Sequence, residues 1–564
     1  MRATRLLLLL APHLLVATAG AGEDVLIKTP DGATLSAAYA LPASSGPVAT
    51  ILTFDIYTNP EAHGAQARQL AERGYAAVVA DARGKRLSPD APVPYEHDAT
   101  DTRAVIDWIS RQPWSNGKVG MIGGSYSGFT AWAATKHRHP ALKAIAVSAA
   151  AIPGQGLPMY HNVFLTANYA WAFYVTNNKL LDETLYADND RWWGLGRKWF
   201  MSGRSYRELD AVDGTPNPWL HRWLEHPSFD AYWQGMVPYR REFANIDIPV
   251  LTITGYYDDA QISAMQYFSE HLRHRPRAEH YVVIGPYDHF GTHAREKPSV
   301  LRGYSIDPTA QLDSEALKLA FMDYVLQGKP RPGLLVDRIN YQVMGANEWR
   351  HVPTLAAMHP APVRLYLSPA RIGSHYLLAD AQPPAEGAVT HVVDLGERVK
   401  FHNFHSYPNP IIQEPLQYVT EAVFESAPFA KATTLSGSFD GELRVSINKR
   451  DFDYGVTVYE AMPDGQLFHL GYSLNRASYV KDATRRNLLT PGKRVRLPFS
   501  TSLVSRRLSP GSKLLVLVDA NKHPMAQINY GTGKDVSDET VTDAGAPLEI
   551  RITSGSFIDV PRDR

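Results

Sequence analysis

The sequence predicts a doubly wound, mostly parallel α/β sheet that carries a helical insertion and is followed by an all-β sandwich. Strand patterns of apolar residues alternate with helix patterns from residue 24 to about 150 and again from about 241 to 355, which is typical of a parallel sheet covered on both faces. Beyond about residue 356, short strands are separated by turns without a long helix. A chain of 564 residues also exceeds what one hydrophobic core usually supports.

The first 21 residues have the pattern of a secretory signal peptide. Arg2 and Arg5 precede an apolar run from Leu6 to Val16, and small residues follow it up to Ala21. Pro12 interrupts the run, which is short for a membrane span. We therefore expect cleavage near Gly22, export, and a mature chain without a membrane span, and a retained anchor is the alternative.

Residues 22–150 are expected to form the first part of the α/β domain. The predicted elements, in order, are the strand Val48–Phe54, the helix His63–Arg73, the strand Tyr75–Ala80, the helix Asp98–Arg111, a strand from Val119 and the strand Leu142–Val147. Strands and helices that alternate in this way favour right-handed crossovers within one sheet.

Ser125 stands where the strand from Val119 turns sharply into the next helix. Such a turn exposes its apex residue and needs glycine where a Cβ would clash. The pattern G-x-S-x-G is only half met, because Ser127 replaces the second glycine, which follows at Gly128. The sequence favours a nucleophile elbow of an α/β hydrolase, and an ordinary strand-to-helix turn is the alternative.

Residues 151–240 are expected to form a helical cap over the site. This segment contains seven of the 11 tryptophans of the chain, namely Trp171, Trp192, Trp193, Trp199, Trp219, Trp223 and Trp233. We expect most of them to pack within the insertion and two or three aromatic side chains to face a pocket.

The expected partners of Ser125 follow two strands in the second part of the α/β domain, residues 241–355. Asp258 comes after the strand Val250–Thr254, and His289 comes after the strand Tyr281–Ile284. Open α/β sheets place their sites at the carboxyl ends of strands, and the order Ser, Asp, His is that of α/β hydrolases. Asp259 is the competing carboxylate and is interpreted as the N-cap of the next helix.

The remainder of the chain, residues 356–564, reads as a β jelly roll, with turn signals between short strands. The chain has 57 basic and 57 acidic side chains, without a polybasic block, so a nucleic-acid partner is not expected. It has no cysteine, which excludes a thiol nucleophile. The pairs His137/His139 and His271/His274 are interpreted as exposed helix faces, and no metal site is predicted.

Several motifs together resemble the cocaine-esterase-like (CocE/NonD) serine hydrolases, relatives of X-Pro dipeptidyl-peptidases and α-amino-acid ester hydrolases. They are Asp81-Ala82-Arg83-Gly84, Gly123-Gly124-Ser125-Tyr126-Ser127-Gly128, Gly255-Tyr256-Tyr257-Asp258, Gly285-Pro286-Tyr287-Asp288-His289 and Gly555-Ser556-Phe557-Ile558. The resemblance implies an oxyanion hole made by the backbone N–H of Tyr126 and the hydroxyl of Tyr57, and no cofactor. Arg83 is expected to hold its loop by ion pairs.

The leading prediction is an exported serine hydrolase that cleaves a small-molecule carboxylic ester. The first alternative is an acylase or X-Pro-type enzyme, acting on an amide or aminoacyl ester with a free α-amino group. It would need a carboxylate cluster at the pocket, for which the cap offers Asp182, Glu183, Asp188 and Asp190. The second alternative is a non-catalytic carbohydrate-binding protein. The sequence does not predict an oligomeric state.

Overall fold

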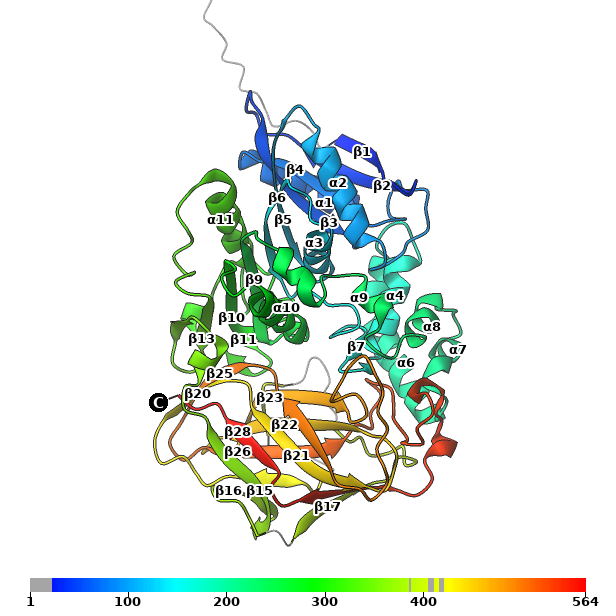
Figure 1. The fold of residues 1–564 in the computed structure, drawn as a ribbon, viewed down its shortest axis with the longest axis vertical. Helices are drawn as coiled ribbons and strands as arrows, with labels where there is room; N and C mark the ends of the chain where they lie inside the picture. Colours follow the sequence, from blue (N-terminus) through cyan, green and yellow to red (C-terminus); the bar gives the residue numbers. More distant parts are fainter. Residues whose placement is uncertain (1–22, 385–386, 404–409, 415–419, 564) are drawn as a thin grey trace, which may run out of the picture.

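The computed structural model describes residues 23–384, 387–403, 410–414 and 420–563. It contains two large sheets, one in the first two thirds of the chain and one in the last third, and the helical insertion lies beside both (Figure 1). The predicted signal peptide, residues 1–21, lies outside the described residues. Within them, no helix is both long and apolar enough to cross a membrane.

The first sheet has ten strands in the order β1-β2-β4-β3-β5-β6-β9-β10-β13-β14. The strands from β4 to β13 in this order are parallel to their neighbours, and β1, β2 and β14 add antiparallel edges. The bounds are β1 Glu23–Lys28, β2 Thr34–Ala40, β3 Val48–Asp55, β4 Ala76–Asp81, β5 Ser115–Gly124, β6 Leu142–Ser148, β9 Val250–Tyr257, β10 His280–Asp288, β13 Ile339–Val343 and β14 Glu348–Val352. The predicted doubly wound α/β class is therefore correct.

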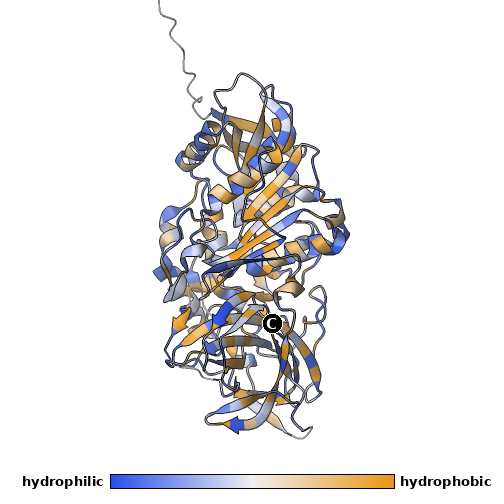
Figure 2. Ribbon diagram, turned by 90° about the vertical axis from the view of Figure 1, so that its left-hand side faces the viewer, coloured by the Kyte–Doolittle hydropathy of each residue, from blue (hydrophilic) through white to orange (hydrophobic). Residues whose placement is uncertain are grey.

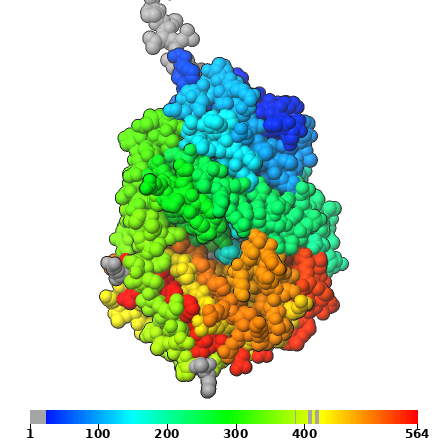
Figure 3. Space-filling view, in the orientation of Figure 1, coloured from blue at the N-terminus to red at the C-terminus, as the bar shows by residue number. Residues whose placement is uncertain are grey.

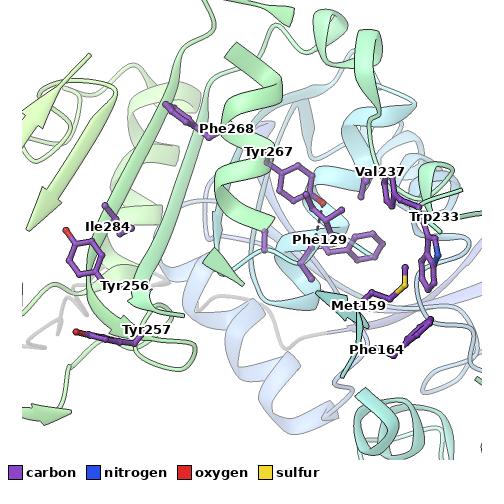
Figure 4. Packing of buried hydrophobic residues seen from close by; sticks show 14 of the residues in the cluster. Phe129, Met159, Phe164, Trp233, Val237, Tyr256, Tyr257, Tyr267, Phe268 and Ile284 are labelled. Carbon is purple, nitrogen blue, oxygen red and sulfur yellow. Dashed lines mark hydrogen bonds between the residues drawn. The ribbon is translucent and has the colours of Figure 1, made fainter. Parts of the chain in front are cut away.

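Helices cover both faces of this sheet. On one face, α1 (Pro60–Glu72) and α11 (Ser314–Gln327) pack in a common buried cluster. On the other face, α2 (Asp98–Ser110), α3 (Tyr126–Lys136) and α10 (Gln261–His274) contribute to the largest cluster, in which Figure 4 shows Phe129, Tyr267 and Phe268. The strands between them are strongly hydrophobic (Figure 2), as burial on both faces requires.

The insertion between β6 and β9 is mainly helical. Its helices are α4 Ala167–Thr176, α5 Glu183–Ala187, α6 Asn189–Ser202, α7 Leu209–Asp213, α8 Pro218–Leu224 and α9 Ala231–Gln234. The structure adds a short hairpin that the sequence analysis did not predict, β7 (Met159–Tyr160) with β8 (Val163–Phe164). Tryptophans from this segment are buried, including Trp199, Trp223 and Trp233, and they belong to the same hydrophobic cluster as α2, α3 and α10, so the insertion shares its core with the sheet domain.

The last third of the chain forms the predicted all-β domain around a 12-stranded sheet. Its strands are β15 Val363–Ile372, β16 His375–Ala379, β17 Ala388–Val393, β18 Ile412–Gln413, β19 Val423–Glu425, β21 Asp440–Ile447, β22 Asp453–Ala461, β23 Leu467–Arg476, β24 Val495–Ser500, β26 Lys513–Ala520, β27 Leu548–Thr553 and β28 Phe557–Val560. A separate two-stranded antiparallel sheet pairs β20 (Thr433–Gly437) with β25 (Val504–Leu508). In Figure 3 this domain, coloured yellow-green to red, lies against both the sheet domain and the insertion.

The structure tests the expectations for two single side chains, Arg83 and His271. Arg83 does hold its loop, because its guanidinium bonds the carboxylates of Asp101 and Asp31. The interpretation of His271 as part of an exposed helix face is wrong. Its side chain is buried, and its Nε2 bonds the backbone oxygen of Ile246.

Candidate active site

Ser125 occupies the apex of the turn between β5 and α3. Its φ of 55° lies in the left-handed region, which costs energy for a residue with a side chain. The two residues before it have to be glycine because space is lacking. A Cβ on Gly123 would lie 2.4 Å from the backbone of Ser127, and one on Gly124 would lie 2.4 Å from the ring of His293. The off-pattern motif therefore builds a strained elbow that presents the Ser125 hydroxyl.

The structure brings together the three residues predicted for the site. His289 Nε2 lies 3.0 Å from Ser125 Oγ, and His289 Nδ1 lies 3.1 Å from Asp258 Oδ1. Asp258 directly follows β9 and His289 directly follows β10, so the two neighbouring parallel strands end at the same edge of the sheet. Asp288, the residue before His289, accepts the N–H of Gly291.

Two adjacent carboxylates face the same nitrogen of His289. Asp258 is buried and fixed, since it also accepts hydrogen bonds from the hydroxyl of Thr254 and the N–H of Ala260. The side chain of Asp259 is 45% exposed, and its Oδ1 lies 2.9 Å from His289 Nδ1. The interpretation of Asp259 as a helix N-cap is wrong, because Ala260 is the N-cap of α10.

The two carboxylates favour the protonated form of the His289 imidazole. Burial by itself lowers the pKa of His289, but the charges of Asp259 and Asp258 outweigh it and raise this pKa well above 6.5. Burial raises the pKa of Asp258, and the imidazole of His289 opposes this. The neighbouring ring of His293 has the opposite character, because burial and the charge of His289 lower its pKa well below 6.5.

The two residues predicted to supply oxyanion-hole donors, Tyr57 and Tyr126, line the same cavity as Ser125. Tyr126 is the first residue of α3, and N–H groups in the first turn of a helix have no acceptor within the helix. The ring of Tyr126 is fixed separately, since its hydroxyl bonds both carboxylate oxygens of Asp98 at 2.9 Å. Tyr57 follows β3, and its backbone N–H bonds Asp55 at 3.2 Å. Burial raises the pKa of the Tyr57 hydroxyl, and the hydrogen bond that this hydroxyl accepts from Trp171 opposes the rise.

A cavity of about 550 Å³ opens over these residues. Aromatic and aliphatic side chains from the insertion form much of its wall, namely Leu157, Trp171, Tyr174, Leu181 and Tyr186. Three aromatic side chains of the insertion, Trp171, Tyr174 and Tyr186, are among the described lining residues, so the expectation that two or three of them face a pocket is confirmed.

The acidic residues of the cap do not line this cavity in the described part of the chain. Asp182 accepts the N–H of Leu185 as the N-cap of α5, and Asp188 accepts the N–H of Arg191 as the N-cap of α6. The carboxylates that do line it are Asp55, Asp259 and Glu315. The acylase alternative required the cap carboxylates at the pocket to bind a substrate ammonium group, and these carboxylates lie elsewhere.

Two groups of His and Asp side chains in the described part of the chain bring three possible metal ligands within 4.8 Å of one another. One is Asp258, Asp259 and His289, where both imidazole nitrogens already have protein partners. The other lies in the β domain, where Asp519 Oδ1 is 2.7 Å from His391 Nε2 and 3.1 Å from His402 Nδ1. These contacts link β17 and the loop after it to β26.

Comparison with known proteins agrees with this architecture. Residues 31–291 match the X-Pro dipeptidyl-peptidase (S15) family, and residues 336–554 match the X-Pro dipeptidyl-peptidase C-terminal non-catalytic domain. The chain is 23% identical over 552 residues to cocaine esterase of Rhodococcus sp. (strain MB1 Bresler), covering 92% of this chain and 93% of the esterase.

Solved structures share the whole fold. An α-amino acid ester hydrolase superposes with a TM-score of 0.77 at 20% identity, covering 98% of each chain. An aminopeptidase from a marine sediment thaumarchaeon superposes with a TM-score of 0.76 at 18% identity, covering 100% of this chain and 99% of the aminopeptidase. The protein is thus a serine hydrolase with an α/β-hydrolase domain and a C-terminal β domain. Within that class the chain belongs to the family described by the two X-Pro dipeptidyl-peptidase models, which together match residues 31–291 and 336–554, and it resembles cocaine esterase and the CocE/NonD family hydrolases.

Proposed function

We propose that this protein hydrolyses small-molecule carboxylic esters through an acyl-enzyme on Ser125. The observation that carries the proposal is the continuous hydrogen-bonded line from Ser125 Oγ to His289 Nε2, at 3.0 Å, and from His289 Nδ1 to Asp258 Oδ1, at 3.1 Å. A serine hydroxyl becomes an effective nucleophile when such a base accepts its proton and a carboxylate orients that base.

In the first half of the reaction, Ser125 Oγ attacks the ester carbonyl carbon while its proton passes to His289 Nε2. The tetrahedral intermediate then collapses as the bond to the leaving oxygen breaks, and His289 returns the proton to the leaving alcohol. In the second half, water attacks the acyl carbon, His289 takes and returns a proton in the same way, and Ser125 is released with the carboxylic acid. Asp258 stabilises the imidazolium form of His289 in both halves.

The negative oxygen of each tetrahedral intermediate needs hydrogen-bond donors that are already in place. The backbone N–H of Tyr126 and the hydroxyl of Tyr57 supply them in this proposal. Removing one donor of this kind typically raises the barrier by about 2.7–4 kcal/mol. Because burial keeps the pKa of Tyr57 high, its hydroxyl stays a donor throughout the neutral pH range.

The wall of the cavity supports an ester with an apolar or aromatic group rather than a substrate with a free α-amino group. Each carboxylate that lines it is already engaged. Asp55 accepts backbone N–H groups, Asp259 contacts His289 and Glu315 pairs with Lys318. A buried ammonium needs carboxylates of its own, and the aromatic wall offers apolar contact instead.

A substrate panel tests this proposal. We expect p-nitrophenyl esters of aliphatic and aromatic acids to be hydrolysed with higher kcat/KM than aminoacyl esters or X-Pro anilides, and Ser125→Ala to abolish the turnover. Preference for substrates with a free α-amino group would favour the acylase or aminopeptidase alternative. A binding protein without turnover is not favoured, because the relatives are serine hydrolases.

A further inference from the structure

The hydroxyl proposed for the oxyanion hole is bonded to the cap. Trp171 Nε1, on α4, donates a hydrogen bond of 2.8 Å to the Tyr57 hydroxyl. An indole nitrogen can only donate, so the Tyr57 oxygen accepts here. The single proton of the Tyr57 hydroxyl is then free for a different acceptor. Tyr57 and Ser125 line the same cavity, so a substrate oxygen held at Ser125 is within the space that this proton can face.

A second set of bonds ties the same parts together through the backbone. The N–H of Leu181, which follows α4, donates to the carbonyl of Thr58 at 3.0 Å. Thr58 is the neighbour of Tyr57 in the chain. The N–H of Arg86 donates to the carbonyl of Lys179 at 2.9 Å. The loop that carries Tyr57 and the loop that carries Arg86 are therefore both bonded to the segment that follows α4.

Lys85 anchors the end of the same helix. Its ammonium group is fully buried and donates to the carbonyl oxygens of Val175, Asn178 and Leu180 at 2.9, 2.7 and 3.3 Å. Val175 lies one helical turn after Trp171. Carbonyl groups at the C-terminal end of a helix lack partners within the helix and carry partial negative charge, so a cation stabilises them.

We propose that cap helix α4 contributes to the oxyanion hole through Trp171. This tryptophan is a positioning residue: its hydrogen bond directs the Tyr57 hydroxyl proton toward the reacting oxygen. The inference rests on the proposed function, since it assigns a role in the same reaction. It implies that the sheet domain alone presents an incomplete site and that docking of the cap, held by Lys85, completes it.

The competing explanation is that Trp171 only shapes the cavity. Its ring stacks on Tyr95 with centroids 5.0 Å apart and lies 5.9 Å from the ring of Tyr126. The substitution Trp171→Phe keeps an aromatic ring there and removes the N–H. Incorporation of 3-benzothienylalanine at position 171 is a finer change, because sulfur replaces the N–H while the bicyclic ring is retained.

A double-mutant cycle with p-nitrophenyl butyrate as substrate separates the two explanations. We expect both changes at position 171 to lower kcat about tenfold, the scale of one lost hydrogen bond, with little change in KM. In a Tyr57→Phe background the same changes should have no further effect on kcat, because the hydroxyl group that Trp171 positions is absent. Trp192→Phe is the matched control, since Trp192 is a cap tryptophan that donates to the Leu185 carbonyl and lies outside the cavity wall.

The proposal is overturned if the benzothienyl variant retains full kcat, or if the losses at positions 57 and 171 multiply. A rise in KM alone would identify Trp171 as a wall residue. Labelling of each variant by a fluorophosphonate, together with its melting temperature, shows whether the elbow is intact. Absence of turnover in the wild type would refute the proposed function itself, whereas equal turnover in wild type and variants would refute only this inference.

Discussion

The substitution Asp259→Asn is the most informative test of the electrostatics around His289. The general base works only as neutral imidazole, so the acid limb of kcat/KM follows the pKa of His289. This pKa is raised, chiefly by Asp259 and Asp258 against the effect of burial. Activity should therefore rise with pH through a limb that lies above 6.5, and removing the charge of Asp259 should move that limb to lower pH.

The size of the shift follows from the geometry. Asp259 Oδ1 lies 2.9 Å from His289 Nδ1, and the Asp259 side chain is 45% exposed, so the interaction is strongly screened. With the dielectric constant of water, two unit charges at this distance interact by about 1.4 kcal/mol, which is about one pH unit. We expect a shift of at least this size, with kcat/KM on the alkaline plateau changed little.

The assay is kcat/KM for a p-nitrophenyl ester, measured from about pH 5 to 9 at constant ionic strength. Asp258→Asn is the comparison variant. It should lower the plateau by orders of magnitude, because the orienting carboxylate is lost and the wrong tautomer is favoured. The reasoning is refuted if Asp259→Asn loses the plateau while Asp258→Asn keeps it, since the two carboxylates would then have exchanged roles.

Three further predictions concern other parts of the molecule. Tyr57→Phe should lower kcat about 100- to 1000-fold while the melting temperature stays close to that of the wild type, and unchanged kinetics would remove Tyr57 from the oxyanion hole. Burial lowers the pKa of Lys85 to about 8 in the folded protein, against 10.5 ordinarily. The unfolded chain thus binds this proton more tightly than the folded protein. The contribution of Lys85 to the free energy of unfolding should therefore increase as pH rises from about 8 to 10.5. Urea titrations should show this trend weakened in Lys85→Met, and an identical pH dependence in both proteins would contradict it. Finally, we propose export through a signal peptide, so N-terminal sequencing of protein from the native host should begin near Gly22, whereas a retained Met1 would exclude cleavage.

The central parts of the site could be predicted because local sequence determines them. Ser125 lies in a turn that glycines alone permit, and Asp258 and His289 each follow an apolar strand. Parallel strands end at one edge of the sheet, so the chain order of such residues fixes which side chains meet. The fold class was predictable for the same reason, since alternation of strands and helices is visible in the sequence.

Other parts depend on contacts that no local pattern encodes. Asp259 follows Asp258 directly, and the path of the turn after β9, rather than a sequence signal, brings its carboxylate to His289. Trp171 and Tyr57 are 114 residues apart in the chain, and no local pattern distinguishes Trp171 from the other six tryptophans of the cap as the partner of Tyr57. The burial of His271 likewise depends on the packing of α10 against the segment around Ile246.

The most direct test of the central claim is intact-protein mass spectrometry after reaction with a fluorophosphonate. The account predicts one adduct per wild-type chain, located by peptide mapping at Ser125, and no adduct on Ser125→Ala. Equal labelling of Ser125→Ala, or an adduct mapped to Ser127, would contradict it.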